Sequence, residues 1–170
     1  MQKQEVEKQF ERQIREHEPL LYKICRIYAN TEEDRQDLFQ EMVIQLWKAF
    51  PRFKGEAQFS TWLYRVAINT AITGLRKNKR SVRTHEPPDS VEQLVDEATG
   101  TAEEEQLQLL YKAIEQLNDV EKAIVMLYME ERTYQEMEEI LGISQGNLRV
   151  KMNRIKERLR QLAKNSAYGT

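Results

Sequence analysis

The segment 133–162 carries the pattern that most limits what this chain can form. Thr133-Tyr-Gln-Glu136 has the form of a capping box, in which threonine and glutamate side chains satisfy free N–H groups at a helix start. Gly142 follows about two turns later and suits the left-handed conformation that ends a helix. Ser144 can cap a second, longer helix. A short helix, a tight turn and a long helix predict a helix-turn-helix.

The long helix of this motif has one apolar side and one polar side. Its apolar residues recur at spacings of four and three, which predicts a buried stripe; they are Leu148, Met152, Ile155, Leu159 and Leu162. A basic outer face alone would suit any solvated helix, but the preceding capping box and glycine turn favour DNA recognition. Arg and Lys suit guanine, Asn and Gln suit adenine, and further basic residues suit phosphates. The predicted DNA-binding residues are Gln145, Asn147, Arg149, Lys151, Asn153, Arg154 and Arg158.

Charge is distributed in blocks along the chain, although the net charge is only -2. Six basic and no acidic residues lie between Arg65 and Arg83, and eight acidic and no basic residues between Glu86 and Glu105. From Arg149 to Lys164 there are seven basic residues against one acidic residue. Two basic blocks separated by an acidic one indicate two contacts with a polyanion, although solvated helix faces can carry such runs as well.

Composition and apolar periodicity predict an all-α fold. With only 6 Gly and 4 Pro, the chain has few of the residues that tight β-turns need. Helices are expected up to residue 30 with a break near Pro19, from Thr31 to just before Pro51, and from a cap at Ser60 or Thr61 to about Arg76. The polar, acidic residues 80–102 predict a flexible linker between two small helical domains, 1–79 and 103–170.

Two further sequence segments lie in the first predicted domain. In Asp37-Leu-Phe-Gln-Glu41 the two acids share a helix face, which is either an ordinary solvated face or a docking surface for a basic partner. Trp62, Tyr64, Arg65 and Asn69 combine rings with a cation and an amide, as single-stranded DNA binding requires. Because aromatic residues at helical spacing usually pack in cores, we expect Trp62 to be at least half buried.

Together these segments resemble the sigma-70 family of RNA polymerase sigma factors, and within it the extracytoplasmic-function (ECF) subfamily. The D-L-x-Q-E motif of sigma region 2 is matched by Asp37, Leu38, Gln40 and Glu41. Its W-L-x-R-x-A-x-N motif is matched by Trp62, Leu63, Arg65, Ala67 and Asn69, with Phe59 in the preceding loop. The region 4 pattern is matched by Tyr134, Glu136, Leu141, Gly142, Ser144 and Gly146.

The resemblance implies a factor that binds core RNA polymerase, recognises the -10 and -35 promoter elements, and melts DNA to start transcription. The residues implied to bind the β′ clamp helices are Asp37, Leu38, Gln40, Glu41 and Trp47. Those implied to read and open the -10 element are Lys54, Phe59, Trp62, Arg65, Asn69, Arg76 and Lys77. The last domain is expected to read the -35 element and contact the β flap, and an anti-sigma factor is an expected partner. No catalysis, cofactor or metal is expected.

The sequence departs from the region 4 pattern at three places. Met137 replaces Ile, and Asn147-Leu148 replaces Thr-Val. Glu138 stands where a small Ala is usual. We expect its carboxylate to face solvent or to pair with Arg149 or Arg154, because an unpaired buried charge is costly. These changes bear on promoter sequence more than on fold.

The remaining features point to a cytoplasmic protein. Cys25 is alone, so no internal disulfide can form, and the charged residues 1–13 do not resemble a signal peptide. Two other kinds of protein remain open on the residues alone. One is a dimeric helix-turn-helix repressor, which would bind a palindromic operator without polymerase. The other is a helical adaptor with no DNA affinity.

Overall fold

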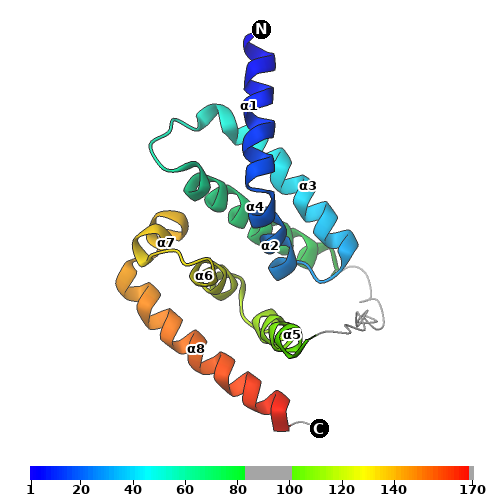
Figure 1. Cartoon of the computed structure of the whole chain (residues 1–170), viewed down its shortest axis with the longest axis vertical. Helices are drawn as coiled ribbons and strands as arrows, with labels where there is room; N and C mark the ends of the chain where they lie inside the picture. The colour runs from blue at the N-terminus through cyan, green and yellow to red at the C-terminus, as the bar shows by residue number, and fades with distance from the viewer. Residues whose placement is uncertain (83–100, 169–170) are drawn as a thin grey trace.

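The computed structural model describes residues 1–82 and 101–168, and these residues form helices and loops without a strand. The first half contains α1 (Gln2–Glu16), α2 (Glu18–Tyr28), α3 (Glu32–Ala49), the short 3-10 helix η1 (Phe50–Arg52) and α4 (Phe59–Val82). The second half contains α5 (Ala102–Glu115), α6 (Asp119–Met129), α7 (Tyr134–Leu141) and α8 (Gln145–Tyr168). Figure 1 shows the two groups of helices as two layers, with α5, α6 and α7 between α8 and the first group. The all-α, two-domain prediction is therefore confirmed.

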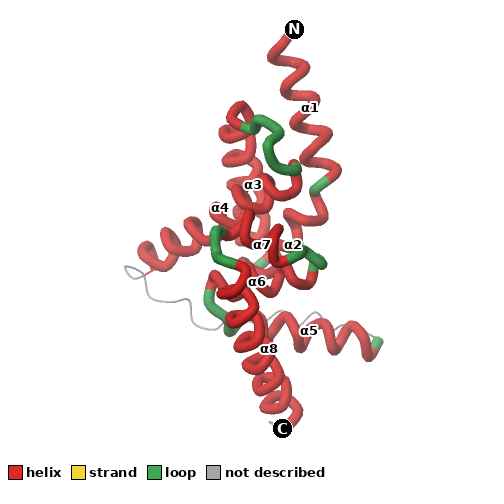
Figure 2. The backbone as a smooth tube through the Cα atoms, turned by 90° about the vertical axis from the view of Figure 1, so that its left-hand side faces the viewer, coloured by secondary structure: helices red, strands yellow, loops and turns green. Residues whose placement is uncertain are grey.

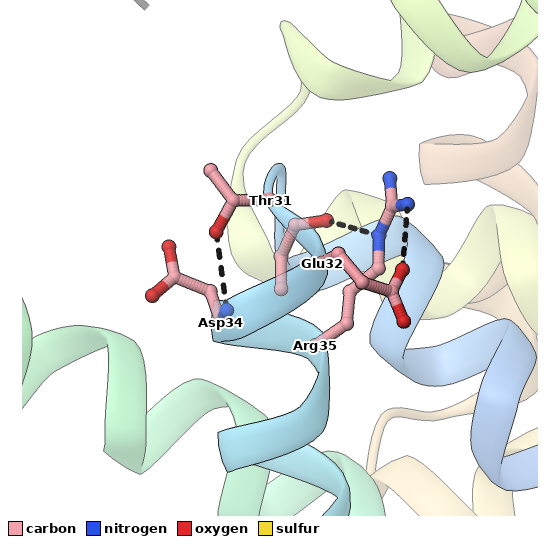
Figure 3. Close-up of polar contacts among 5 residues, drawn as sticks. Thr31, Glu32, Asp34 and Arg35 are labelled. Carbon is pink, nitrogen blue, oxygen red and sulfur yellow. Dashed lines mark hydrogen bonds and ion pairs between the residues drawn. The ribbon is translucent and has the colours of Figure 1, made fainter. Parts of the chain in front are cut away.

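Helix α3 begins at the cap that its sequence predicts. The Thr31 side chain accepts a hydrogen bond from the Asp34 amide at 3.1 Å, and acidic residues fill the first turn. Arg35 donates from Nε to the Ala29 carbonyl at 3.1 Å and lies 4.0 Å from the Glu32 carboxylate (Figure 3). The bond from Arg35 to Ala29 ties the start of α3 to the end of α2.

The core of the first group lies where α2, α3 and α4 meet. The fully buried side chains are Leu21, Ile24, Met42, Leu46, Leu63, Tyr64, Ala67 and Ala71. Helix α1 extends past this core, as Figure 2 shows, and is anchored to it by Phe10 and Ile14. Burying aliphatic and aromatic side chains of this size stabilises each by roughly 1.5–3 kcal/mol relative to exposure.

Helix α4 differs from its sequence prediction at both ends. The helix begins at Phe59, so the prediction of a cap at Ser60 or Thr61 is wrong. The Trp62 amide donates to the Gln58 carbonyl at 3.1 Å, which places the start of the helical hydrogen bonding earlier. Helix α4 runs to Val82, past the predicted end near Arg76. Most of the predicted linker 80–102 lies outside the described residues, and the domain limits stay predictions.

Candidate promoter and polymerase interfaces

Helices α7 and α8 form the helix-turn-helix predicted from the sequence. Thr133 and Glu136 make both hydrogen bonds of the capping box, at 3.1 and 2.9 Å. Gly142 ends α7 with φ of 71°, and this left-handed conformation costs glycine little. The Ser144 hydroxyl accepts from the Asn147 amide at 3.3 Å and caps α8. The buried side chains of Met137, Ile140 and Leu148 join the two helices. 

The predicted recognition face of α8 lies in solvent. Leu148, Met152 and Ile155 are buried and Leu159 is partly buried, which confirms the apolar stripe. Six of the seven predicted DNA-binding side chains are exposed; they are Asn147, Arg149, Lys151, Asn153, Arg154 and Arg158. The seventh, Gln145, is half-buried. The helix thus has a polar and basic surface that is not buried by packing within the chain.

Several of these side chains have partners. The Arg149 guanidinium lies 5.1 Å from the centre of the Tyr134 ring, and Lys156 lies 4.6 Å from the Tyr128 ring. Such cation–π contacts limit the freedom of long side chains. Arg158 donates to the Gln116 carbonyl at 3.3 Å and lies 3.9 Å from the Glu121 carboxylate. Arg158 therefore points toward α5 and α6 in this structure.

Glu138 was expected to face solvent or to pair with Arg149 or Arg154, and the structure shows neither arrangement. Its carboxylate accepts a hydrogen bond from the Gln145 amide at 3.0 Å, and both residues are half-buried. Arg149, one of the expected partners, stacks on Tyr134 instead. The sequence signalled that Glu138 is unusual but did not identify its partner.

Two of the candidate -10 residues, Phe59 and Trp62, lie in an aromatic cluster. Phe50, Phe53, Phe59 and Trp62 pack with ring centres 5.2–6.5 Å apart, and His17 lies 5.1 Å from Phe59. Trp62 and Phe59 are half-buried, so Trp62 is about as buried as expected.

The polar candidates on and near α4 differ from the aromatic ones. Lys54, in the preceding loop, is exposed, and so are Arg65 and Asn69 on α4. The Arg65 guanidinium donates to the backbone carbonyl of Glu139 in the second domain. Arg76 and Lys77 lie on α4, but their side chains are outside the described set.

The candidate polymerase-binding residues lie along α3. Asp37, Gln40 and Glu41 are exposed, and Leu38 is half-buried. Trp47 is 38% exposed and meets Phe10 edge-on at 5.0 Å. Ile44, 45% exposed, lies three residues before Trp47 and was missed by the motif comparison. Ile44 could have been found from the sequence, because its spacing from Gln40 and Trp47 places it on the same helix face as these residues.

The two domains contact each other through polar as well as apolar groups. Lys23 binds the Glu130 carboxylate, and the Tyr28 hydroxyl donates to the Asp119 carbonyl at 2.7 Å. The Arg26 guanidinium lies 4.1 Å from the centre of the Tyr111 ring. The sequence signals none of these contacts, because each joins residues far apart in the chain.

Burial changes the acidity of three groups, two of which, Tyr28 and Tyr64, lie near this contact. Desolvation raises the pKa of Tyr64 to about 12, with Glu130 adding to the rise and Arg132 opposing it. Desolvation also raises the pKa of Tyr28, and the negative charge of Asp119 adds to this rise. The pKa of the Cys25 thiol rises to about 11, mainly through burial, so the unreactive protonated form prevails near neutral pH.

A groove of about 640 Å³ lies between α5 and α8. Its apolar lining comes from Leu109, Leu110 and Ala113 on one side and from Leu159, Leu162 and Ala163 on the other. Across the described parts of the chain, no helix has the length and apolarity to span a membrane, and no group of metal-binding side chains is found.

Comparison with known proteins agrees with this arrangement. The Sigma-70 region 2 family matches residues 13–81, and the Sigma-70, region 4 family matches residues 107–159. The ECF RNA polymerase sigma-E factor of Escherichia coli (strain K12) is 30% identical over 140 residues, which cover 73% of this chain and 71% of that protein. The ECF RNA polymerase sigma factor SigM of Mycobacterium tuberculosis is 25% identical over 154 residues, covering 90% and 76%.

Two solved structures share the fold. The sigma factor RpoE in complex with the anti-sigma factor NepR, from Bartonella quintana, superposes with a TM-score of 0.75 at 21% identity and covers 92% of this chain and 98% of that chain. CnrH in complex with the cytosolic domain of CnrY gives a TM-score of 0.66 at 18% identity, covering 93% and 89%.

The fold, with the exposed polar face of α8, defines a helix-turn-helix protein, and the family matches place it in the transcription machinery. The chain belongs to the sigma-70 family, as an ECF RNA polymerase sigma factor. Sigma factors are not enzymes. Family membership favours an initiation factor over the repressor and the adaptor that the residues alone left open.

Proposed function

We propose that this chain binds core RNA polymerase in the cytoplasm, directs it to promoters through their -10 and -35 elements, and helps to open the DNA. The observation that carries the proposal is the exposed polar face of α8, held by a capped helix-turn-helix in a chain that also has region 2. A repressor needs only the first of these features. A factor that places polymerase on a promoter needs both.

The -35 element is read by the first half of α8 in this proposal. Arg149 and Lys151 are exposed there and suit the acceptor atoms of guanine in the major groove. Asn147 and Asn153 suit adenine, and Arg154 suits a phosphate. Arg158 would have to leave Glu121 and Gln116 to reach DNA, so it contributes less than the others.

The -10 element is opened at the aromatic cluster. Phe59 and Trp62 are only partly buried. Lys54 and Asn69, a few residues away along the chain, are exposed. An unstacked base can stack on a ring while a cation holds the backbone. Flipping one base costs a few kcal/mol, which stacking and pocket contacts must offset. Arg65 becomes available for DNA only when its bond to the Glu139 carbonyl opens.

Core polymerase docks on α3 and on the second domain. The acidic and amide side chains of Asp37, Gln40 and Glu41, next to the exposed Trp47, suit a partner with basic and apolar groups, which we assign to the β′ clamp helices. The exposed Ile44 enlarges the apolar part of this surface. The groove between α5 and α8 is the candidate site for the β flap.

An anti-sigma factor completes the list of proposed partners. The structure of RpoE was solved with the anti-sigma factor NepR, and this chain superposes on that sigma factor over nearly all of its length. An anti-sigma factor that held the two domains together would keep Arg65 away from DNA.

Co-purification with core polymerase tests the proposal. Asp37→Arg combined with Gln40→Ala reverses the charge of the α3 face, and we expect it to abolish recovery of core polymerase with the full-length chain. Glu5→Arg combined with Gln9→Ala makes the same kinds of change at exposed positions of α1 and serves as the matched control. Undiminished recovery with the α3 double variant would reject this face as the docking surface.

A further inference from the structure

The bond between Glu138 and Gln145 crosses the turn of the helix-turn-helix. Glu138 lies in the second half of α7, and Gln145 is the first residue of α8. The Glu138 Oε2 atom accepts from the Gln145 Nε2 atom at 3.0 Å. The described ion pairs do not include Glu138. We propose that Glu138 is a positioning residue that sets the base preference of Gln145, making adenine the preferred base at one position of the -35 element.

The amide of Gln145 can both donate and accept hydrogen bonds. An amide has two N–H donors on one side and a carbonyl acceptor on the other, and a free side chain can turn over to present either. The Glu138 carboxylate accepts only, so it bonds the nitrogen side of Gln145 and repels the carbonyl oxygen. Glu138 therefore holds one N–H of Gln145 and leaves its Oε1 atom and its second N–H available.

These two free groups match one base edge in the major groove. Adenine presents the N6 amino donor beside the N7 acceptor, and a glutamine can bind both at once. Guanine presents two acceptors, O6 and N7, and would face the Gln145 carbonyl oxygen with the Glu138 charge behind it. Orientation by Glu138 thus favours adenine over guanine, and the negative charge opposes any acceptor-rich edge.

The neighbouring residues make this orientation stable. Arg149 lies one turn after Gln145 on α8 and is placed over the Tyr134 ring at 5.1 Å. It therefore does not draw the Glu138 carboxylate away from Gln145. Because both Glu138 and Gln145 are half-buried, water competes less for their bond than at an open surface.

The inference rests on the proposed -35 recognition by α8, and the experiment separates the two. Holoenzyme assembled from core polymerase and the full-length chain is used to select from promoter DNA with a randomised -35 element. The wild type is expected to select adenine at one position. Glu138→Ala is expected to lower the preference for adenine over guanine at that position by about fivefold or more, since a bidentate base contact contributes roughly 1–3 kcal/mol of discrimination.

Three further variants make the result specific. Gln145→Ala should lose the same preference, and Glu138→Gln should retain much of it because the new amide oxygen still accepts from Gln145. Glu139→Ala removes the same charge from the neighbouring exposed residue and should leave the preference unchanged. Thermal unfolding of each variant shows that the domain still folds.

Different failures have different meanings. If the wild type selects no -35 sequence, both the inference and the proposed function are overturned. If the wild type selects a -35 sequence and Glu138→Ala keeps its base preference, only the inference is overturned. A uniform loss of binding at all positions in Glu138→Ala would also overturn it, since that result indicates a purely structural role.

Discussion

Helices α8 and α4 carry the two candidate DNA surfaces, and they are built differently. On α8 the buried stripe of Leu148, Met152 and Ile155 is separate from the exposed recognition residues. On α4 the candidate residues Phe59 and Trp62 belong to the aromatic cluster that packs the domain. With the proposed DNA-binding roles, stability and recognition depend on different residues in α8 and on shared residues in α4.

This difference determines how substitutions should behave. A change on the outer face of α8 removes a DNA contact and leaves the fold intact. A change in the α4 cluster alters packing and DNA contact together.

The largest effect should come from the buried stripe of α8. Leu148 is fully buried, so Leu148→Ala should lower the free energy of unfolding by about 2–5 kcal/mol through lost burial and a cavity. Arg149→Ala, at the next and exposed position, should lower it by no more than about 1 kcal/mol, the scale of its cation–π contact with Tyr134. Urea denaturation followed by circular dichroism measures both. Similar losses for the two variants would contradict the separation of roles in α8.

In the aromatic cluster of α4, one substitution should affect both stability and promoter opening. Because Trp62 contacts Phe50, Phe53 and Phe59, Trp62→Ala should lower the free energy of unfolding by about 3 kcal/mol and also impair promoter opening. Lys54→Ala, in the exposed loop, should impair opening without the loss of stability. Permanganate footprinting of melted thymines and thermal unfolding give the two readouts. A Trp62→Ala chain of normal stability would show that recognition and packing are separable in α4 as well.

The exposed face of α8 should affect DNA binding alone. Arg149→Ala should weaken holoenzyme binding to a -35 site by about 1–3 kcal/mol if Arg149 contacts a base. The loss should be confined to sequences with the preferred base at one position. Lys156 lies later in the helix, over the Tyr128 ring. Lys156→Ala should instead weaken binding to all DNA sequences to a similar extent, as expected for a phosphate contact. Competition binding with single-base variants distinguishes the two patterns, and an even loss for Arg149→Ala would assign it to a phosphate.

Alkaline pH should loosen the contact between the domains. Tyr64 has a folded pKa of about 12, against 10.0 for an ordinary tyrosine, so its contribution to stability is complete below pH 10 and is lost as the pH rises toward 12. At pH 11 the loss should be about 1 kcal/mol. Tyr64→Phe should lose less stability than the wild type between pH 9 and pH 11, as measured by urea denaturation. Parallel pH profiles for the two proteins would mean that Tyr64 does not titrate in this way.

The sequence predicted best what depends on neighbouring residues. The capping box at Thr133, the Gly142 turn and the Thr31 cap each involve residues three to nine positions apart, and all are found in the structure. The start of α4 was missed because Phe59 joins the helix while packing against Phe50 and Phe53. That choice depends on tertiary contacts, which local capping rules do not include.

The candidate sites show the same limit. Motif positions indicated which side chains are functional candidates, and exposure on α8 and α3 agrees with that assignment. The engagement of Arg65 by the Glu139 carbonyl joins residues 74 positions apart and has no sequence signal. The partner of Glu138 was also not predictable: its bond to Gln145 spans the turn between α7 and α8, and Arg149 lies over the Tyr134 ring.

Run-off transcription with core polymerase on genomic DNA fragments shows whether this chain directs polymerase to promoters. With the full-length chain added, we expect discrete transcripts that require both the chain and the polymerase and that start at a fixed distance from a shared pair of sequence elements. The Asp37→Arg, Gln40→Ala chain should give none of them. Transcripts identical to those of core polymerase alone would contradict the assignment of this chain as a promoter-directing factor.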